Sequence, residues 1–169
     1  MNRIEITSVL VEYNQIIFNK FPSFLKRAII LFLKKLLHID EINNIIESFK
    51  YKSGIDFIDE LFELLDISYT VSAKDKLKIP SEGKLLVVSN HPLGGVDGLI
   101  LLKLISDVRS DVKIVVNDIL LNIDNLKNHF LPFNVFSGKT QRENIELIYK
   151  SINNNEAIIV FPAGEVSRV

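Results

Sequence analysis

Residues 85–102 have the sequence LLVVSNHPLGGVDGLILL. The first four residues are apolar, the middle contains a proline and two adjacent glycines, and the last four are apolar again. An apolar run that breaks at proline and glycine and resumes at helical spacing predicts a strand, a tight loop and a helix. His91 and Asp97 are therefore expected at the two ends of one short loop, where a strand ends.

A histidine and an aspartate in such a loop form a candidate general base. Imidazole is the only side chain whose unperturbed pKa lies near neutrality, and a nearby carboxylate can fix its tautomer and its orientation. The alternative is structural, because an aspartate that enters a helix is often its N-cap, here for a helix beginning near Gly98. A single histidine is also often a surface residue, so the pair alone leaves both interpretations open.

The rest of the chain alternates helices and strands. A charged segment, residues 72–84, separates a helical N-terminal region (1–71) from an α/β region (72–169). We expect a helical extension followed by a mixed or mostly parallel sheet flanked by helices, with active groups at the carboxyl ends of the strands. Helices are predicted over residues 4–18, 22–37, 41–49, 54–65, 119–126 and 141–153, and further strands over 112–116 and 157–160.

Composition excludes several classes of function. With 169 residues, 47% of them apolar and 24% charged, the chain can bury one core. A formal net charge of −1 argues against a general nucleic-acid binder. The absence of cysteine excludes disulfides, thiolate metal sites and cysteine nucleophiles. Three scattered histidines have no ligand spacing, so we expect no metal site and disfavour a metal hydrolase.

Basic residues gather in the segment 20–38. It contains five basic residues and no acidic one, interleaved with apolar residues at spacings of three and four. We interpret it as a helix on a membrane surface, with cations against anionic headgroups. The alternative is an ordinary amphipathic helix packed on the α/β region. The basic residues are Lys20, Lys26, Arg27, Lys34 and Lys35, and Leu25, Ile29, Phe32 and Leu36 form the predicted apolar side.

Two loops together carry a family resemblance. The sequence NHPLGGVDG, residues 90–98, resembles the first motif of the PlsC-type glycerolipid acyltransferases, in the form of a bacterial branch related to hemolysin-annotated acyltransferases. Residues 161–168, FPAGEVSR, follow an apolar run and are similar to the Phe-Pro-Glu-Gly-Thr-Arg-Ser motif of the same superfamily. Two motifs in the right order, each at a strand end, are more specific than either alone.

The resemblance implies an O-acyltransferase of phospholipid biosynthesis, similar to 1-acylglycerol-3-phosphate acyltransferases. It would move a fatty acyl group from acyl-CoA or acyl carrier protein to a hydroxyl of a lysophospholipid or an N-acyl amino-acid lipid, without a further cofactor. His91 would be the general base, and Asp97 would stabilise the imidazolium. Expected partners are membrane lipids and the acyl donor but no nucleic acid, and the expected place is peripheral, on the cytoplasmic face of the inner membrane.

The resemblance also implies substrate-binding positions. Basic residues of the family's second and third motifs hold the anionic head of the acceptor, and Arg142 is the closest positional match, with Lys139 as a second cation. The N–H groups of Gly94 and Gly95 are candidate oxyanion donors. His38 and His129 are expected to be structural. The predicted substrate-binding set is Asn90, Gly94, Gly95, Lys139, Arg142, Gly164, Glu165 and Arg168.

The resemblance predicts the geometry of the site. Five residues separate His91 from Asp97, one more than in the family, and the two side chains should still meet at hydrogen-bonding distance, roughly 2.6 to 3.2 Å. The turn over residues 161–164 should lie on the same edge of the sheet, because its strand should run parallel to the first. Arg142 or Arg168 should point into the same cleft.

The chain also departs from the family pattern. The glutamate position of the third motif is Ala163 and its arginine position is Val166, while Glu165 and Arg168 carry the same charges two residues further on. These are compensating shifts or recognise another headgroup. A further strand and a fourth motif are absent from the sequence, so we expect a domain truncated at the C-terminus.

Two other classes of function remain to be weighed. One is a non-catalytic membrane-binding domain, or inactive fragment, with an acyltransferase-like fold. The other is a nucleotide-phosphate loop, which is disfavoured because residues 94–98 fit neither G-x-G-x-x-G nor a lysine-bearing P-loop.

Overall fold

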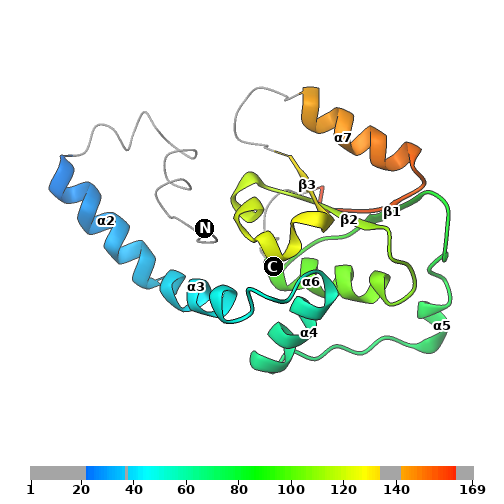
Figure 1. The fold of residues 1–169 in the computed structure, drawn as a ribbon, viewed down its shortest axis with the longest axis horizontal. Helices are drawn as coiled ribbons and strands as arrows, with labels where there is room; N and C mark the ends of the chain where they lie inside the picture. Colours follow the sequence, from blue (N-terminus) through cyan, green and yellow to red (C-terminus); the bar gives the residue numbers. More distant parts are fainter. Residues whose placement is uncertain (1–21, 37, 134–141, 163–169) are drawn as a thin grey trace.

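The computed structural model describes residues 22–36, 38–133 and 142–162 (Figure 1). This part of the chain alternates helices and strands in the predicted order. The elements are α2 (Ser23–Leu36), α3 (Ile39–Ser48), α4 (Ile55–Leu64), α5 (Ala73–Lys76), β1 (Leu85–Val88), α6 (Gly95–Ser106), β2 (Val112–Val116), the 3₁₀ helices η1 (Asp118–Asn122) and η2 (Asp124–His129), β3 (Phe130–Pro132), α7 (Arg142–Asn153) and β4 (Ala157–Val160).

The strands form one parallel sheet in the order β1-β4-β2-β3. Val88 of β1 is in register with Val160 of β4, and Ile114 of β2 with Ile159 of β4. Because every pairing is parallel, the carboxyl ends of these strands gather at one edge of the sheet. The prediction of an α/β fold with a mostly parallel sheet and a helical extension is confirmed.

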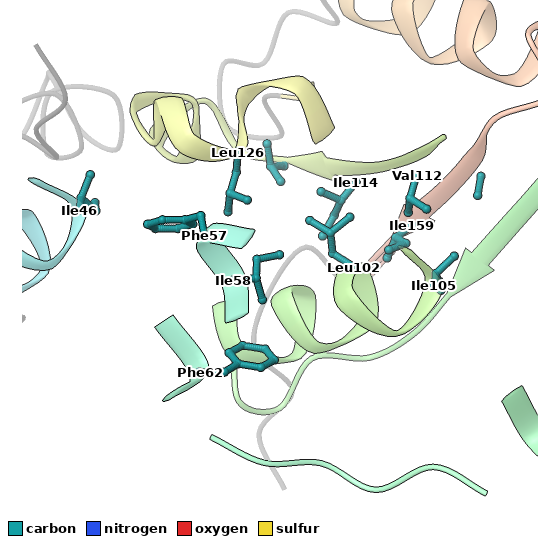
Figure 2. Packing of buried hydrophobic residues seen from close by; sticks show 12 residues of the cluster. Ile46, Phe57, Ile58, Phe62, Leu102, Ile105, Val112, Ile114, Leu126 and Ile159 are labelled. Atoms are coloured by element: carbon teal, nitrogen blue, oxygen red, sulfur yellow. The ribbon is translucent and has the colours of Figure 1, made fainter. Parts of the chain in front are cut away.

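Helices cover both faces of the sheet (Figure 1). α4 and α6 lie on one face, where their apolar side chains pack against alternate residues of β2 and β4 (Figure 2). α7 lies on the opposite face, against β3 and β4. Ile158 of β4 is completely buried and belongs to this second face, since successive strand residues point in opposite directions. The core of the first face includes Phe57, Ile58, Phe62, Leu102, Ile105, Val112, Ile114, Leu126 and Ile159.

A buried arginine ties together the amino ends of three strands. The guanidinium of Arg109 donates to both carboxylate oxygens of Asp111, from Nε to Oδ1 at 2.7 Å and from Nη2 to Oδ2 at 2.8 Å. It also donates to the carbonyls of Pro80 (3.2 Å), Gly83 (2.8 Å) and Asn155 (2.9 Å). These acceptors lie in the segments that enter β1, β2 and β4, at the edge of the sheet opposite the two motifs. The arginine therefore fixes the strand entries relative to one another.

Several element predictions need correction or lie outside the described residues. The helix predicted over residues 119–126 is two 3₁₀ helices, because Ile123 between them has a non-helical backbone (φ −91°, ψ 84°). α6 begins at Gly95, three residues before the expected start near Gly98. The segment 72–84 contains the short helix α5, which the side chain of Ser72 caps by accepting from the Asp75 N–H. The helix predicted over residues 4–18 lies outside the described residues.

α2 and α3 extend away from the α/β part, to the left in Figure 1. The backbone turns between them at His38, which has a left-handed conformation (φ 50°) and contacts Glu41 at 2.9 Å. Within the described residues, none of the helices has the length and apolar character needed to cross a membrane.

Candidate active site

Two neighbouring strands deliver the two predicted motifs to one place. The loop after β1 begins at Ser89, whose N–H donates to the carbonyl of Val160 at 3.2 Å, so the β1–β4 ladder extends one residue beyond the strand. His91 therefore leaves β1 beside Phe161, which directly follows β4. The prediction that both motifs lie on the same edge of the sheet is met by these residues.

His91 opens a hydrogen-bonded turn. The N–H of Gly94 donates to the carbonyl of His91 at 3.1 Å, which closes a four-residue turn with Pro92 in its second position. Proline favours this position because its ring presets the required φ. Gly94 has a φ of 70° and a ψ of −127°, a conformation that residues with a side chain rarely adopt. The sequence thus explains why the chain turns sharply here and enters α6 at Gly95.

Asp97 fastens this turn to the helix. It lies in the first turn of α6, and its Oδ2 accepts a hydrogen bond from the backbone N–H of Leu93 at 2.7 Å. A carboxylate near a helix N-terminus is also stabilised by the helix dipole. The side chain therefore reaches back across the N-terminus of the helix, much as the third residue of a capping box does.

The imidazole of His91 packs against an aromatic ring. The ring centroids of His91 and Phe161 are 4.7 Å apart, with 52° between the ring planes. The Nε2 atom of His91 is buried and has no hydrogen-bond partner among the described residues. Buried polar atoms without partners are rare in folded proteins, and functional sites are among the places where they occur. The site thus contains a half-buried imidazole whose Nε2 atom can still form a hydrogen bond.

The expected hydrogen bond between His91 and Asp97 is not formed in the described structure. No hydrogen bond or ion pair joins the two side chains there, and the Asp97 carboxylate is instead engaged by the Leu93 N–H. The cause is local, because Asp97 follows the turn within the first turn of α6 and reaches the turn's own backbone. That arrangement supports the helix-capping alternative for Asp97, which the sequence had left open.

Comparison with known proteins agrees with the meeting of these two motifs. The family model described as "Acyltransferase" matches residues 8–169. The chain belongs to the acyltransferase family. It is 34% identical over 163 residues to a lyso-glycine lipid O-acyltransferase of Bacteroides thetaiotaomicron, covering 94% of this chain and 59% of that protein. A protein of the same name from Phocaeicola vulgatus is 34% identical over 146 residues, covering 86% of this chain and 51% of that protein.

The chain corresponds to only part of each of these relatives. The chain spans between 51% and 59% of their length. No solved structure matches it.

The other predicted site residues lie in different settings. Asn90 is exposed in the loop before His91. Arg142 is exposed and is the first residue of α7. Because α7 connects the parallel strands β3 and β4, it runs antiparallel to them, and its first residue faces the carboxyl edge of the sheet. Lys139, Gly164, Glu165 and Arg168 lie outside the described residues.

The backbone N–H groups of Gly94 and Gly95 differ in whether they are free to bind an oxyanion. The Gly94 N–H already donates a hydrogen bond to the His91 carbonyl and closes the turn, so it is not free to bind an oxyanion in this structure. Gly95 is the first residue of α6, where the helix itself provides no acceptor for backbone N–H groups. The remaining oxyanion donors are therefore expected in the first turn of α6.

The other two histidines have structural contacts, in line with the sequence interpretation. Nδ1 of His129 lies 2.9 Å from the carbonyl of Val112, and Nδ1 of His38 lies 2.9 Å from Oε1 of Glu41. Within the described residues, no group of three or more histidine and carboxylate side chains is placed to hold a metal ion.

Sequence reasoning missed two residues that shape the site. A Cβ built on Gly98 would lie 3.3 Å from Cδ1 of Ile114 and 3.7 Å from Cε2 of Phe161, so a glycine lets α6 approach the sheet and Phe161 closely. The signal was present, because a single glycine inside an apolar helical run commonly marks close packing. The contact of Phe161 with His91 had no sequence signal beyond its place after a strand.

Proposed function

We propose that this protein transfers a fatty acyl group from a thioester donor, acyl-CoA or acyl carrier protein, to a hydroxyl of a lysolipid. The observation that carries the proposal is the imidazole of His91, half-buried on Phe161 with Nε2 unpartnered, at the strand edge where the two family motifs meet. Family membership supports the class of reaction. We assign His91 as the general base because it occupies the histidine position of the first family motif, whereas His129 and His38 make contacts elsewhere in the described residues.

The reaction follows from the chemistry of the two substrates. The imidazole takes the proton of the acceptor hydroxyl while the hydroxyl oxygen attacks the thioester carbonyl carbon. The new C–O bond forms, the C–S bond breaks, and the proton passes to the leaving thiolate. Backbone N–H groups in the first turn of α6 lie at the positive end of the helix dipole, where negative charge on the carbonyl oxygen is stabilised. No acyl-enzyme is needed, since holding both substrates in place supplies much of the acceleration.

Among acceptors, we propose an N-acyl amino-acid lipid of the lyso-glycine type. The two relatives carry this name, and the third motif lacks the glutamate and arginine positions of the glycerol-phosphate pattern, which are Ala163 and Val166 here. A lysophospholipid such as lysophosphatidate is the second candidate, and exposed Arg142 would suit an anionic head of either kind.

The test is acyl transfer by the complete purified protein. Lyso-glycine lipid or lysophosphatidate is offered with palmitoyl-CoA or palmitoyl-carrier protein, and the O-acylated product is measured by mass spectrometry. We expect product from lyso-glycine lipid at a higher rate than from lysophosphatidate. Faster acylation of lysophosphatidate would overturn the acceptor, and failure of every donor with both acceptors would leave the membrane-binding alternative.

We also propose that α2 docks on an anionic membrane and that the protein is peripheral, on the cytoplasmic face of the inner membrane. Phe24, Leu31, Phe32 and Leu36 are each 58–73% exposed, although they are large apolar side chains. Leu25 and Ile29 of the predicted apolar side are partly buried instead. The sequence of α2 contains basic residues and no acidic residue, so its charge complements anionic headgroups.

Removing four cations should weaken this docking. Changing Lys26, Arg27, Lys34 and Lys35 to Gln should lower binding to vesicles of anionic phospholipid by roughly fivefold per residue, since each contributes about 1 kcal/mol near the surface. Vesicle co-sedimentation at low and high salt measures the effect, which salt should reduce. The matched control changes four exposed lysines elsewhere, Lys74, Lys84, Lys127 and Lys150, to Gln. Equal losses in the two quadruple variants would leave only net charge as the explanation.

A further inference from the structure

The position of the proposed base depends on an aromatic ring. The His91 and Phe161 rings are 4.7 Å apart between centroids, and the Nε2 atom of His91 has no hydrogen bond to hold it. An imidazole without such a bond is oriented by what it packs against. Here that surface is Phe161.

Phe161 lies directly after a paired strand and beside α6. It follows β4, whose last residue Val160 accepts the hydrogen bond from Ser89 of the neighbouring loop. On the α6 side, a Cβ on Gly98 would be in ordinary van der Waals contact with Phe161 Cε2, at 3.7 Å. The Phe161 ring therefore has neighbours on two sides, the His91 imidazole and α6.

Asp97 acts on another part of the loop. Its carboxylate accepts from the Leu93 N–H at 2.7 Å, and the Gly94 N–H closes the turn onto the His91 carbonyl at 3.1 Å. These two bonds fix the backbone that follows His91. The imidazole itself is contacted by neither of them.

We infer that Phe161 is the residue that orients the His91 imidazole, and that Asp97 is a positioning residue which acts through the turn instead of pairing with the imidazole. The inference rests on the proposed function, because it assigns roles around the base of that reaction. It predicts that Asp97 serves as a hydrogen-bond acceptor, a task that the neutral carboxamide of asparagine can also perform.

Kinetics of the complete protein separate these roles. Phe161→Leu should lower kcat on the order of 100-fold, because a small misplacement of a catalytic group has effects of this size, with little change in KM for the acceptor. Asp97→Ala should also lower kcat, whereas Asp97→Asn should keep at least tenfold more activity than Asp97→Ala. Phe49→Leu is the matched control, because Phe49 also contacts an aromatic ring, that of Phe57, with the ring centroids 6.4 Å apart. If Asp97→Asn is as inactive as Asp97→Ala, the carboxylate charge acts on the imidazole and the inference is wrong.

A spectroscopic measurement keeps the inference testable apart from the activity. The Phe161 ring, which packs against the imidazole, should shift the His91 ring-proton NMR signals through its ring current. We expect this shift to disappear in Phe161→Leu and to persist in Asp97→Asn. Its persistence in Phe161→Leu would overturn the orienting role, even if acyl transfer itself proves as proposed. Conversely, full activity of a His91→Ala variant would reject the proposed function and leave the packing result standing.

Discussion

Replacing His91 by alanine should lower acyl transfer by roughly 10²- to 10⁴-fold, the usual contribution of a general base. The fold should survive, because His91 is only half-buried in a loop and the hydrogen bond that closes its turn uses its backbone carbonyl. The rate of product formation measures the first effect. Far-ultraviolet circular dichroism and the thermal midpoint measure the second.

His129→Gln provides the control for this experiment. His129 is half-buried like His91, but its Nδ1 contacts the carbonyl of Val112 at the start of β2. Its substitution should cost about 1 kcal/mol of stability through the lost hydrogen bond and leave turnover as in the parent. Turnover at the parental rate in His91→Ala would remove His91 from the mechanism.

The strands and their common edge could be predicted because they depend on local composition. Residues 112–116 and 157–160 are short runs rich in valine and isoleucine, and both form strands with the predicted bounds. Parallel pairing followed from the alternation of strands with helices. The two motifs were therefore correctly expected at the same edge of the sheet, whereas the direct pairing of β1 with β4 was not predicted.

The side-chain contacts could not be predicted, because the separation of two residues along the sequence does not determine where their side chains point. A separation of five residues allows Asp97 to face either the imidazole or the turn, and the early start of α6 decides in favour of the turn. Residues 119–126 have apolar spacing suited to a helix, but the backbone at Ile123 divides them into two 3₁₀ helices. Arg109 gave no signal, because its carbonyl partners lie 26 to 46 residues away in the chain.

Arg109→Met should destabilise the protein more than any substitution of an exposed charge. The Arg109 side chain is 1% exposed, and its loss removes two bonds to Asp111 and leaves three backbone carbonyls without their donor. Breaking a buried ion pair costs 3–5 kcal/mol, and we expect about 3 kcal/mol because Asp111 is partly exposed. Urea denaturation at neutral pH measures the loss. Lys78→Met is the matched control, because Lys78 pairs with Asp75 at the surface, and it should leave the midpoint unchanged.

The same pair should make part of the stability depend on pH. The hydrogen bonds from Arg109, opposed by burial, hold the pKa of the Asp111 carboxyl below its ordinary value. A carboxyl whose pKa is lower in the folded state stabilises the protein above its unfolded pKa, about 4, and loses that contribution as the pH falls further. The difference in unfolding free energy between the parent and Arg109→Met should therefore be full at pH 7 and shrink below about pH 4. If the difference between the two proteins instead stays constant as the pH falls below about 4, the guanidinium does not stabilise the charged carboxylate, and Arg109 holds the strand entries through its carbonyl bonds alone.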